Sequence, residues 1–213
     1  MRVLVTLFVV SLSARAAAPT IDIKVDQAGY LPGFAKLAMV GWQDRAKPAA
    51  QNFTVRRADD NSVVLRGNLQ PPVTDPDSGD SVQIADFSAL RQNGMFYLEV
   101  PGVGRSWNFS IAPDVFRRAY YLAMRSFYGQ RCGVAVDLSP EFPQYKHAAC
   151  HLDGADHESA GKQGPHASAK GWHDAGDYGR YVVNGGISTG TILWTWELFQ
   201  DRIRNIGLHI PES

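Results

Sequence analysis

Hydrophobic and polar residues alternate through most of the first half of the chain. Residues 21–26, Ile-Asp-Ile-Lys-Val-Asp, show the two-residue period of a half-buried strand. Turn-forming residues separate the later candidates, as in Ala58–Asn61 and Gln70–Asp80. The other predicted strands are Lys36–Gly41, Asn52–Arg57, Val63–Gly67, Ser81–Asp86, Gly94–Val100 and Ser106–Ile111. Short strands at this spacing predict an all-β immunoglobulin-like sandwich over residues 20–112.

The hydrophobic period changes to that of a helix after Ala112. Pro113 and Asp114 suit a first helical turn, because proline is tolerated there and an acid complements the helix dipole. We expect this helix to run to about Tyr128 and to stop at Gly129. Its predicted apolar face consists of Val115, Ala119, Tyr120, Ala123 and Phe127.

A segment with little periodicity, Gln130–Gly179, separates the first helix from a second one that ends near Phe199. Irregular segments of about 50 residues inside a domain are usually functional or tethered. The predicted buried face of the second helix is Ile187, Thr191, Trp194 and Leu198. Residues 113–213 are thus predicted to begin an all-α domain. Two helices are too few to form its core, so we expect the front part of a longer protein.

The first residues have the pattern of an export signal. Arg2 supplies positive charge, Val3–Leu12 is almost wholly apolar, and Ala14–Ala16 offers small residues for cleavage. About ten apolar residues are too few to span a bilayer, so residues 1–17 are predicted to be a signal peptide rather than an anchor. We expect a secreted or periplasmic protein with no membrane partner after cleavage. A formal net charge of +0 gives no reason to expect nucleic acid as a partner.

Two aspartates stand three positions apart in the segment Gly171–Tyr181. Carboxylates as close as Asp174 and Asp177 repel each other unless each has a partner or a role. The aromatic residues beside them are Trp172, Tyr178 and Tyr181. Aromatic faces stack on sugar rings and carboxylates transfer protons, so the pattern suits a carbohydrate site whose walls would be these aromatics. The alternative is an Asp-rich structural turn with the aromatics packed beneath it.

Two polar residues after the aspartates receive structural predictions. Arg180 is expected to face solvent, since lone charged residues are mostly exposed. Asn184 is expected to cap the start of the second helix.

The long irregular segment also contains a possible set of metal ligands. Its members are Cys132, Cys150, His151 and His173. Two thiolates and two imidazoles suit tetrahedral zinc, and four protein ligands leave no position for water, so this zinc would be structural. The alternative is a Cys132–Cys150 disulfide, because exported proteins are oxidised. The remaining candidates are predicted to be solvated loop residues: His147, Asp153, His157 and His166.

Two stretches of the chain resemble a known family. Residues 171–179, Gly-Trp-His-Asp-Ala-Gly-Asp-Tyr-Gly, with residues 181–186, Tyr-Val-Val-Asn-Gly-Gly, resemble the N-terminal catalytic signature of family 9 glycoside hydrolases, mostly cellulases. Residues 25–32, Val-Asp-Gln-Ala-Gly-Tyr-Leu-Pro, resemble the opening of the immunoglobulin-like domain in one branch of that family. The resemblance implies an (α/α)6 barrel that begins within residues 113–213. It also implies inverting hydrolysis of β-1,4-glucan polysaccharides or oligosaccharides, as by an endoglucanase.

The resemblance also assigns roles to individual residues. It implies that Asp177 is the general base that activates water and that Asp174 helps to hold and polarise the same water. The structural zinc ligands that it implies are Cys132, Cys150, His151 and His173. It places any calcium site in a part of the domain beyond these residues.

Inversion also needs a general acid on the other side of the sugar ring. The acid and base lie roughly 6.5–9.5 Å apart on opposite sides of the ring. Two aspartates of one short turn therefore lie on the same side of the sugar and can only help to activate the water. The family's acid is a glutamate far toward the C-terminus, and Glu141, Glu158 and Glu197 do not lie in its motif. We therefore expect an N-terminal fragment without hydrolase activity of its own. A noncatalytic carbohydrate-binding module and a zinc-dependent hydrolase are the alternatives.

Overall fold

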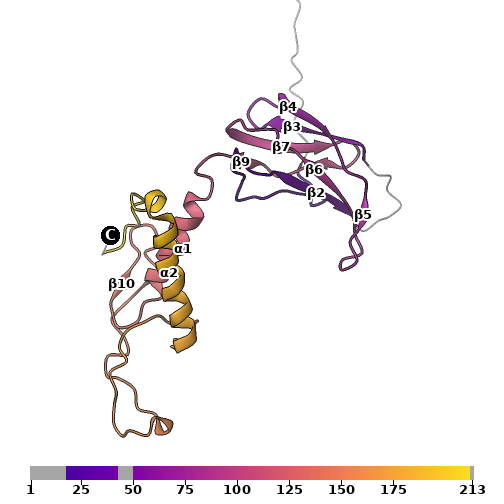
Figure 1. Ribbon diagram of the computed structural model, residues 1–213. Coiled ribbons are helices and arrows are strands. Elements are labelled where there is room, and N and C mark those ends of the chain that lie inside the picture. Colours follow the sequence, from indigo (N-terminus) through magenta and orange to yellow (C-terminus); the bar gives the residue numbers. More distant parts are fainter. Residues whose placement is uncertain (1–17, 43–49, 212–213) are drawn as a thin grey trace, which may run out of the picture. The chain divides into compact units, whose positions relative to one another are not determined.

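The computed structural model describes residues 18–42 and 50–211, and it divides into two compact units between Phe116 and Arg117 (Figure 1). The predicted signal peptide, residues 1–17, lies outside the described residues. Within the described ranges, no helix combines the length and apolar character that crossing a membrane requires.

Two antiparallel sheets form the first unit (Figure 1). The strands of one sheet, in spatial order, are β1 (Ile23–Lys24), β2 (Leu37–Trp42), β6 (Ser81–Asp86) and β5 (Val73–Thr74). The strands of the other are β4 (Val63–Asn68), β3 (Asn52–Arg57), β7 (Gly94–Val100) and β8 (Gly104–Arg105), and β9 (Phe109–Ile111) also pairs with β7. This arrangement confirms the predicted β-sandwich, and the bounds of β3, β6 and β7 agree with the sequence prediction.

The last predicted strand, Ser106–Ile111, is shortened in the structure to β9. The backbone N–H of Ser106 donates to the carbonyl of Leu98 at 2.7 Å, and the hydroxyl of Ser106 accepts from the N–H of Leu98 at 3.0 Å. The hydroxyl thus takes the place of a backbone carbonyl in the ladder. Regular pairing therefore resumes only at Phe109.

Aromatic side chains fill the space between the two sheets. Phe87, Phe96 and Phe109 are almost completely buried, and the ring centroids of Phe87 and Phe109 lie 5.2 Å apart. The ring of Tyr30 meets both Phe87 and Phe109 edge-on, a favourable geometry for aromatic pairs. Both cysteines belong to the second unit, so packing rather than a disulfide holds this sandwich together.

Phe96→Ala is expected to lower the free energy of unfolding of the sandwich by about 3–5 kcal/mol, because it leaves a cavity where a fully buried ring was packed. Urea denaturation of the whole chain measures the change. Met95→Ala is the matched control. Met95 is the neighbour of Phe96 on β7 and is 50% exposed, so its replacement should change stability little. Equal losses in the two variants would contradict this account of the core.

The second unit contains two helices with a long irregular segment between them (Figure 1). Its elements are α1 (Arg117–Gly129), β10 (Val136–Asp137), β11 (Lys146–His147), the 3₁₀ turn η1 (Glu158–Ala160) and α2 (Val182–Ile203). β10 and β11 are antiparallel and place Val136 opposite His147. The predicted irregular segment therefore contains the β10–β11 pair and one helical turn, together with isolated antiparallel bridges such as Arg131–Trp172.

Helix α1 starts later than predicted, at Arg117 instead of Pro113, and it buries a different face. Ala123 is exposed, whereas Arg125 and Tyr128 are buried. The Arg125 guanidinium donates to the carbonyls of Leu138, Leu208 and His209. Segments that return from far along the chain cover this polar residue, and local periodicity does not reveal such segments.

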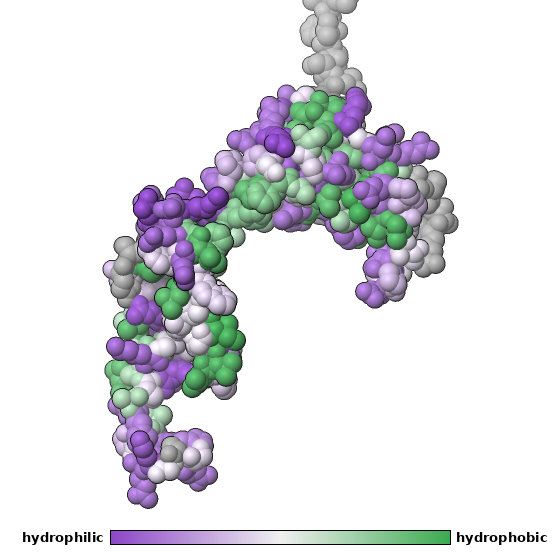
Figure 2. Space-filling view, viewed as in Figure 1, coloured by the Kyte–Doolittle hydropathy of each residue, from purple (hydrophilic) through white to green (hydrophobic). Residues whose placement is uncertain are grey.

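The predicted buried face of α2 is wrong. Ile187, Trp194 and Leu198 are 65%, 70% and 70% exposed, and none of the helix's side chains is fully buried in the described part of the chain. We call these three residues the outer face of α2; Figure 2 shows hydrophobic residues gathered over the start of this helix. The opposite face of α2 carries small residues, and two of them, Gly185 and Ser188, line a hollow next to α1. Helical periodicity located an apolar stripe but could not tell what covers it.

Candidate metal site and carboxylate turn

The four predicted metal ligands come together from three separate stretches of the second unit. Residues 130–132 and 171–173 run antiparallel: the N–H of Cys132 donates to the carbonyl of Gly171, and the N–H of His173 donates to the carbonyl of Gln130. Each of these bonds is 2.8 Å long. This short ladder brings Cys132 and His173 together. Cys150 and His151, which follow β11, complete the group.

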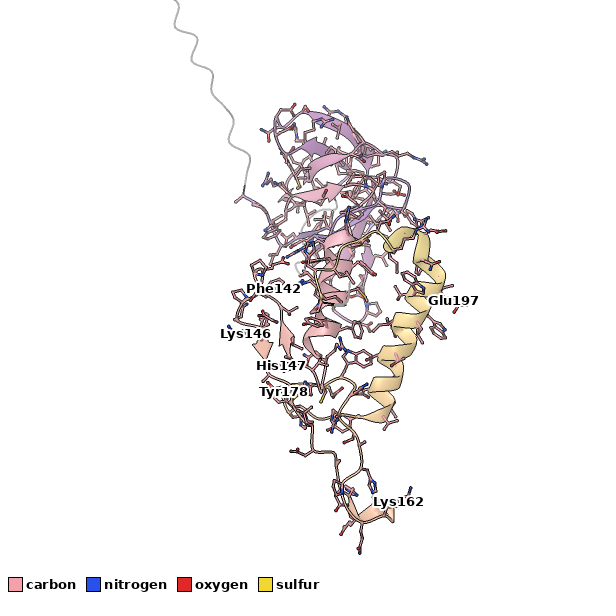
Figure 3. All side chains as sticks on the ribbon, turned by 90° about the vertical axis from the view of Figure 1, so that its left-hand side faces the viewer. Phe142, Lys146, His147, Lys162, Tyr178 and Glu197 are labelled. Carbon is pink, nitrogen blue, oxygen red and sulfur yellow. The ribbon has the colours of Figure 1, made fainter. Side chains whose placement is uncertain are left out.

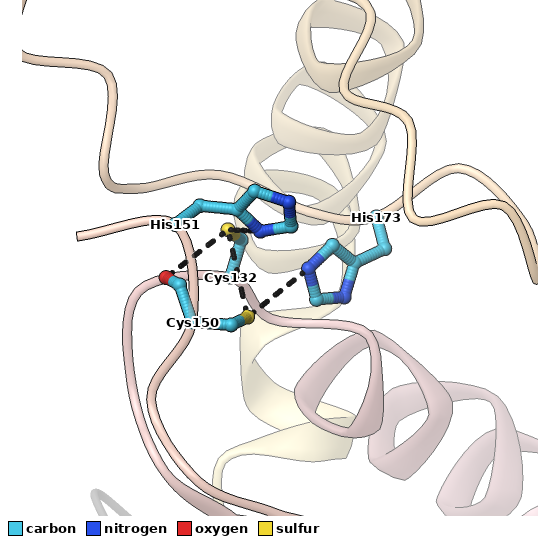
Figure 4. A group of neighbouring side chains, drawn as sticks. All are labelled: Cys132, Cys150, His151 and His173. Carbon is cyan, nitrogen blue, oxygen red and sulfur yellow. Dashed lines mark hydrogen bonds between the residues drawn. The ribbon is translucent and has the colours of Figure 1, made fainter. Parts of the chain in front are cut away.

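The ligand atoms of the group converge on one point (Figure 4). The two Sγ atoms lie 4.0 Å apart, Cys132 Sγ lies 3.3 Å from His151 Nδ1, and Cys150 Sγ lies 3.4 Å from His173 Nε2. All four atoms fall within 4.8 Å of one another. Ordinary zinc bond lengths in a tetrahedron predict roughly 3.8 Å between two sulfurs and roughly 3.6 Å between sulfur and nitrogen. The donor set and its spacing therefore fit a zinc-like ion.

The two cysteines are free thiols in this structure, 4.0 Å apart at sulfur. A disulfide would require about 2.05 Å. Of the two alternatives left by the sequence, the geometry matches shared metal ligation rather than a covalent bond.

The environment of His173 favours its neutral form. The residue is only 4% exposed, and burial, followed by the nearby His151, His147 and Arg180, lowers its pKa below the ordinary histidine value. A metal ligand must be a neutral imidazole, because a protonated nitrogen has no lone pair to share. His151 has positive φ (54°), an uncommon conformation for a residue other than glycine, and its Nδ1 faces Cys132 Sγ.

Asp174 and Asp177 lie on the tight turn that follows His173. The N–H of Asp174 donates to the carbonyl of Gly179 at 2.8 Å, which closes the turn, and Tyr178 within it has positive φ (58°). One oxygen of Asp177, Oδ1, accepts the N–H of Gly179 at 2.9 Å. Both aspartates are exposed, so the turn presents two carboxylates to solvent.

Asn184 does not cap α2, contrary to the sequence prediction. The N-cap residue is Tyr181, which makes no side-chain capping bond. Asn184 instead donates from Nδ2 to Oδ1 of Asp174. The sequence signal that could have indicated this role was an amide in the first turn of α2, close to two carboxylates that need hydrogen-bond donors.

The three predicted aromatic walls are arranged differently from one another. Trp172 is half-buried, and its indole N–H donates to the carbonyl of Phe127 at 2.8 Å, so this residue packs the turn against α1. Tyr178 and Tyr181 are 55% and 54% exposed, and the rings of Tyr178 and His173 form a T-shaped pair with centroids 4.9 Å apart. The two tyrosines therefore remain open faces beside the carboxylates, while Trp172 chiefly supports the turn.

Two hollows border the turn. One of 560 Å³ is lined by Trp172, Tyr178, Arg180 and Tyr181 among others, and one of 180 Å³ contains Asp174 and Asn184. Arg180, predicted to face solvent, is half-buried and donates to the hydroxyl of Ser168 at 3.3 Å. This bond ties the turn to the preceding loop.

None of the three glutamates considered above is hydrogen-bonded to Asp174 or Asp177 in the described part of the chain. Hydrogen bonds from Arg118 and Tyr121 lower the pKa of Glu141, whereas a general acid needs a raised pKa. Glu158 begins η1, and Glu197 projects from α2 away from Tyr178 (Figure 3).

Comparison with known proteins extends these observations. Residues 18–105 match the cellulase N-terminal ig-like domain, and residues 116–212 match glycosyl hydrolase family 9. Endoglucanase D of Acetivibrio thermocellus is 38% identical over 193 residues, covering 90% of this chain and 29% of the relative. The solved structure of a metagenome-derived glycoside hydrolase family 9 endoglucanase has a TM-score of 0.76 and 34% identity, covering 90% of this chain and 36% of that one.

A second similar solved structure is a Zn-binding triple mutant of the family 9 endoglucanase J30, with a TM-score of 0.73 and 32% identity over 86% of this chain and 34% of that one. The chain thus spans about a third of the length of the relatives it matches. An immunoglobulin-like sandwich followed by the helical start of a catalytic domain defines the class as glycoside hydrolase. Within that class, the chain belongs to glycosyl hydrolase family 9, among the members with an N-terminal immunoglobulin-like domain.

Proposed function

We propose that the chain supplies the water-activating half of an inverting endo-β-1,4-glucanase active site, with Asp177 as general base. The observation that carries this proposal is an exposed turn in which the two carboxylates have different hydrogen-bond partners. Asn184 binds Oδ1 of Asp174, and Asp177 keeps Oδ2 without a hydrogen-bond partner among the described residues. An accessible carboxylate oxygen is what a general base needs to take a proton from water.

The general acid of this mechanism is proposed to come from a further helical segment. The outer face of α2 is apolar and uncovered by the described residues, and the relatives are about three times as long as this chain. Helices packed on that face would bury it and carry an acid to the far side of the sugar ring. We expect the 213-residue chain alone to release no sugar.

The proposed metal ion is zinc, and the residues that would hold it are Cys132, Cys150, His151 and His173. When bound, it supplies structural cross-linking and no open position for water. His173 directly precedes Asp174, so fixing that imidazole fixes the start of the carboxylate turn.

The chain is proposed to act outside the cytoplasm, an inference that rests on the apolar pattern of residues 1–17.

The test uses a polypeptide that continues this chain with the remaining helices of a family 9 domain. It is expected to release reducing ends from a soluble cellulose derivative, and NMR of a cello-oligosaccharide digest should show the α-anomer of the product first, because inversion converts a β-linkage to an α-product. Initial formation of the β-anomer would contradict the inverting assignment.

The exposed Tyr178 and Tyr181 favour a second candidate function for the 213 residues alone, which is glucan binding without cleavage. Retention of this chain on cellulose, with the longer polypeptide also inactive, would support the binding module over the enzyme.

A further inference from the structure

His147 was predicted to be a solvated loop residue, but the structure places it beside the metal site. It is half-buried on β11, and its ring centroid lies 5.9 Å from that of His173, with the ring planes at 56°. Figure 3 shows His147 on the same side of the second unit as Tyr178. It is outside the group of four converging ligands, so its role in the site has to be an indirect one.

The hydrogen bonding of His147 fixes its tautomer. Nδ1 lies 2.7 Å from the carbonyl oxygen of Ala148, and because a carbonyl only accepts, Nδ1 must carry the proton. The other nitrogen, Nε2, then has a bare lone pair in the neutral ring. That atom is buried and has no hydrogen-bond partner. A buried acceptor without a donor is uncommon in native proteins and calls for a partner.

His173 has the complementary requirement. Its Nε2 faces Cys150 Sγ at 3.4 Å and is therefore the nitrogen directed at the metal position. When Nε2 binds a metal, the proton must reside on Nδ1, and metal-binding histidines almost always donate that proton to an acceptor. Among the described residues, no hydrogen bond from Nδ1 of His173 is present.

We propose that Nε2 of His147 accepts the Nδ1–H of His173 in the metal-loaded protein, and that His147 is thereby a positioning residue for this ligand. One bond satisfies both the orphaned acceptor and the proton that metal binding fixes on its neighbour. The register of β10 and β11 supports His147, since it pairs with Val136, a buried member of the small core formed with Tyr128 and Leu138. The acceptor therefore lies on a strand that is paired with this small core.

This proposal rests on the metal site proposed above, and zinc affinity of the whole chain tests it. Competition with a chromophoric chelator should show binding about 10- to 100-fold weaker in His147→Ala, the usual effect of losing a partner of a metal-bound histidine. His147→Gln keeps a side-chain acceptor and should retain affinity close to that of the unsubstituted chain. His166→Ala, which removes an exposed histidine from the same irregular segment, should leave affinity unchanged.

A second measurement separates positioning from packing. In ¹H–¹⁵N spectra of the zinc-loaded chain, the Nδ1 proton of His173 should exchange slowly with water, and it should exchange rapidly in His147→Ala. Equal zinc affinity in His147→Ala and the unsubstituted chain, or equal losses in the Ala and Gln variants, would overturn the role of His147 alone. Failure of the unsubstituted chain to bind zinc would overturn the metal site and this role together.

Discussion

Asp177→Asn is expected to lower the rate of glucan hydrolysis by the longer polypeptide by about 10²- to 10⁴-fold, the usual contribution of a general base. Asparagine keeps the size of the side chain and an oxygen that can accept the N–H of Gly179, so the turn should persist. It cannot take a proton from water. The expected loss is therefore in kcat, measured by reducing-end release, with binding of a cello-oligosaccharide retained.

Asp153→Asn is the matched control for this substitution. Asp153 is an exposed carboxylate of the irregular segment, outside the turn, and its replacement should leave the rate unchanged. If Asp177→Asn behaved like this control, Asp177 would not be the base. A fall in glucan binding equal to the fall in rate would instead point to a binding role.

Removal of the metal is expected to loosen residues 130–179 while leaving the β-sandwich intact. Structural zinc sites contribute about 10–16 kcal/mol of binding free energy that is coupled to folding. Here the proposed ligands join segments that otherwise share few regular elements. Hydrogen exchange followed by mass spectrometry should show faster exchange in residues 130–179 after treatment with a chelator, with the strands of the first unit unaffected.

The same experiment separates the three interpretations of the cysteines. A structural zinc predicts that stability of the second unit and activity of the longer polypeptide fall together and recover when zinc is restored. A catalytic zinc predicts that activity is lost while exchange stays slow. A Cys132–Cys150 disulfide predicts no response to the chelator and an intact mass 2 Da lower than that of the dithiol, because oxidation removes two hydrogen atoms.

The β-sandwich and the members of the candidate metal group were predictable from sequence, for a physical reason. Alternation of polar and apolar residues directly reports which face of a strand is buried, so β3, β6 and β7 were predicted with the correct bounds. The metal group was also predictable as a set, because thiolates and imidazoles are the donors that zinc prefers. In both cases the information resides in residue type and spacing.

Contacts between segments far apart in the chain could not be predicted in this way. The pairing of Asn184 with Asp174, the burial of Arg125 under Leu208 and the position of His147 beside His173 depend on how loops return to the helices. The exposed outer face of α2 could not be predicted for the same reason, because periodicity identifies an apolar stripe but not the segment that packs against it. Residue type and local spacing thus specified the strands and the candidate chemistry, whereas three-dimensional packing determined the partners of each side chain, because burial and hydrogen bonding depend on neighbours that sequence distance does not encode.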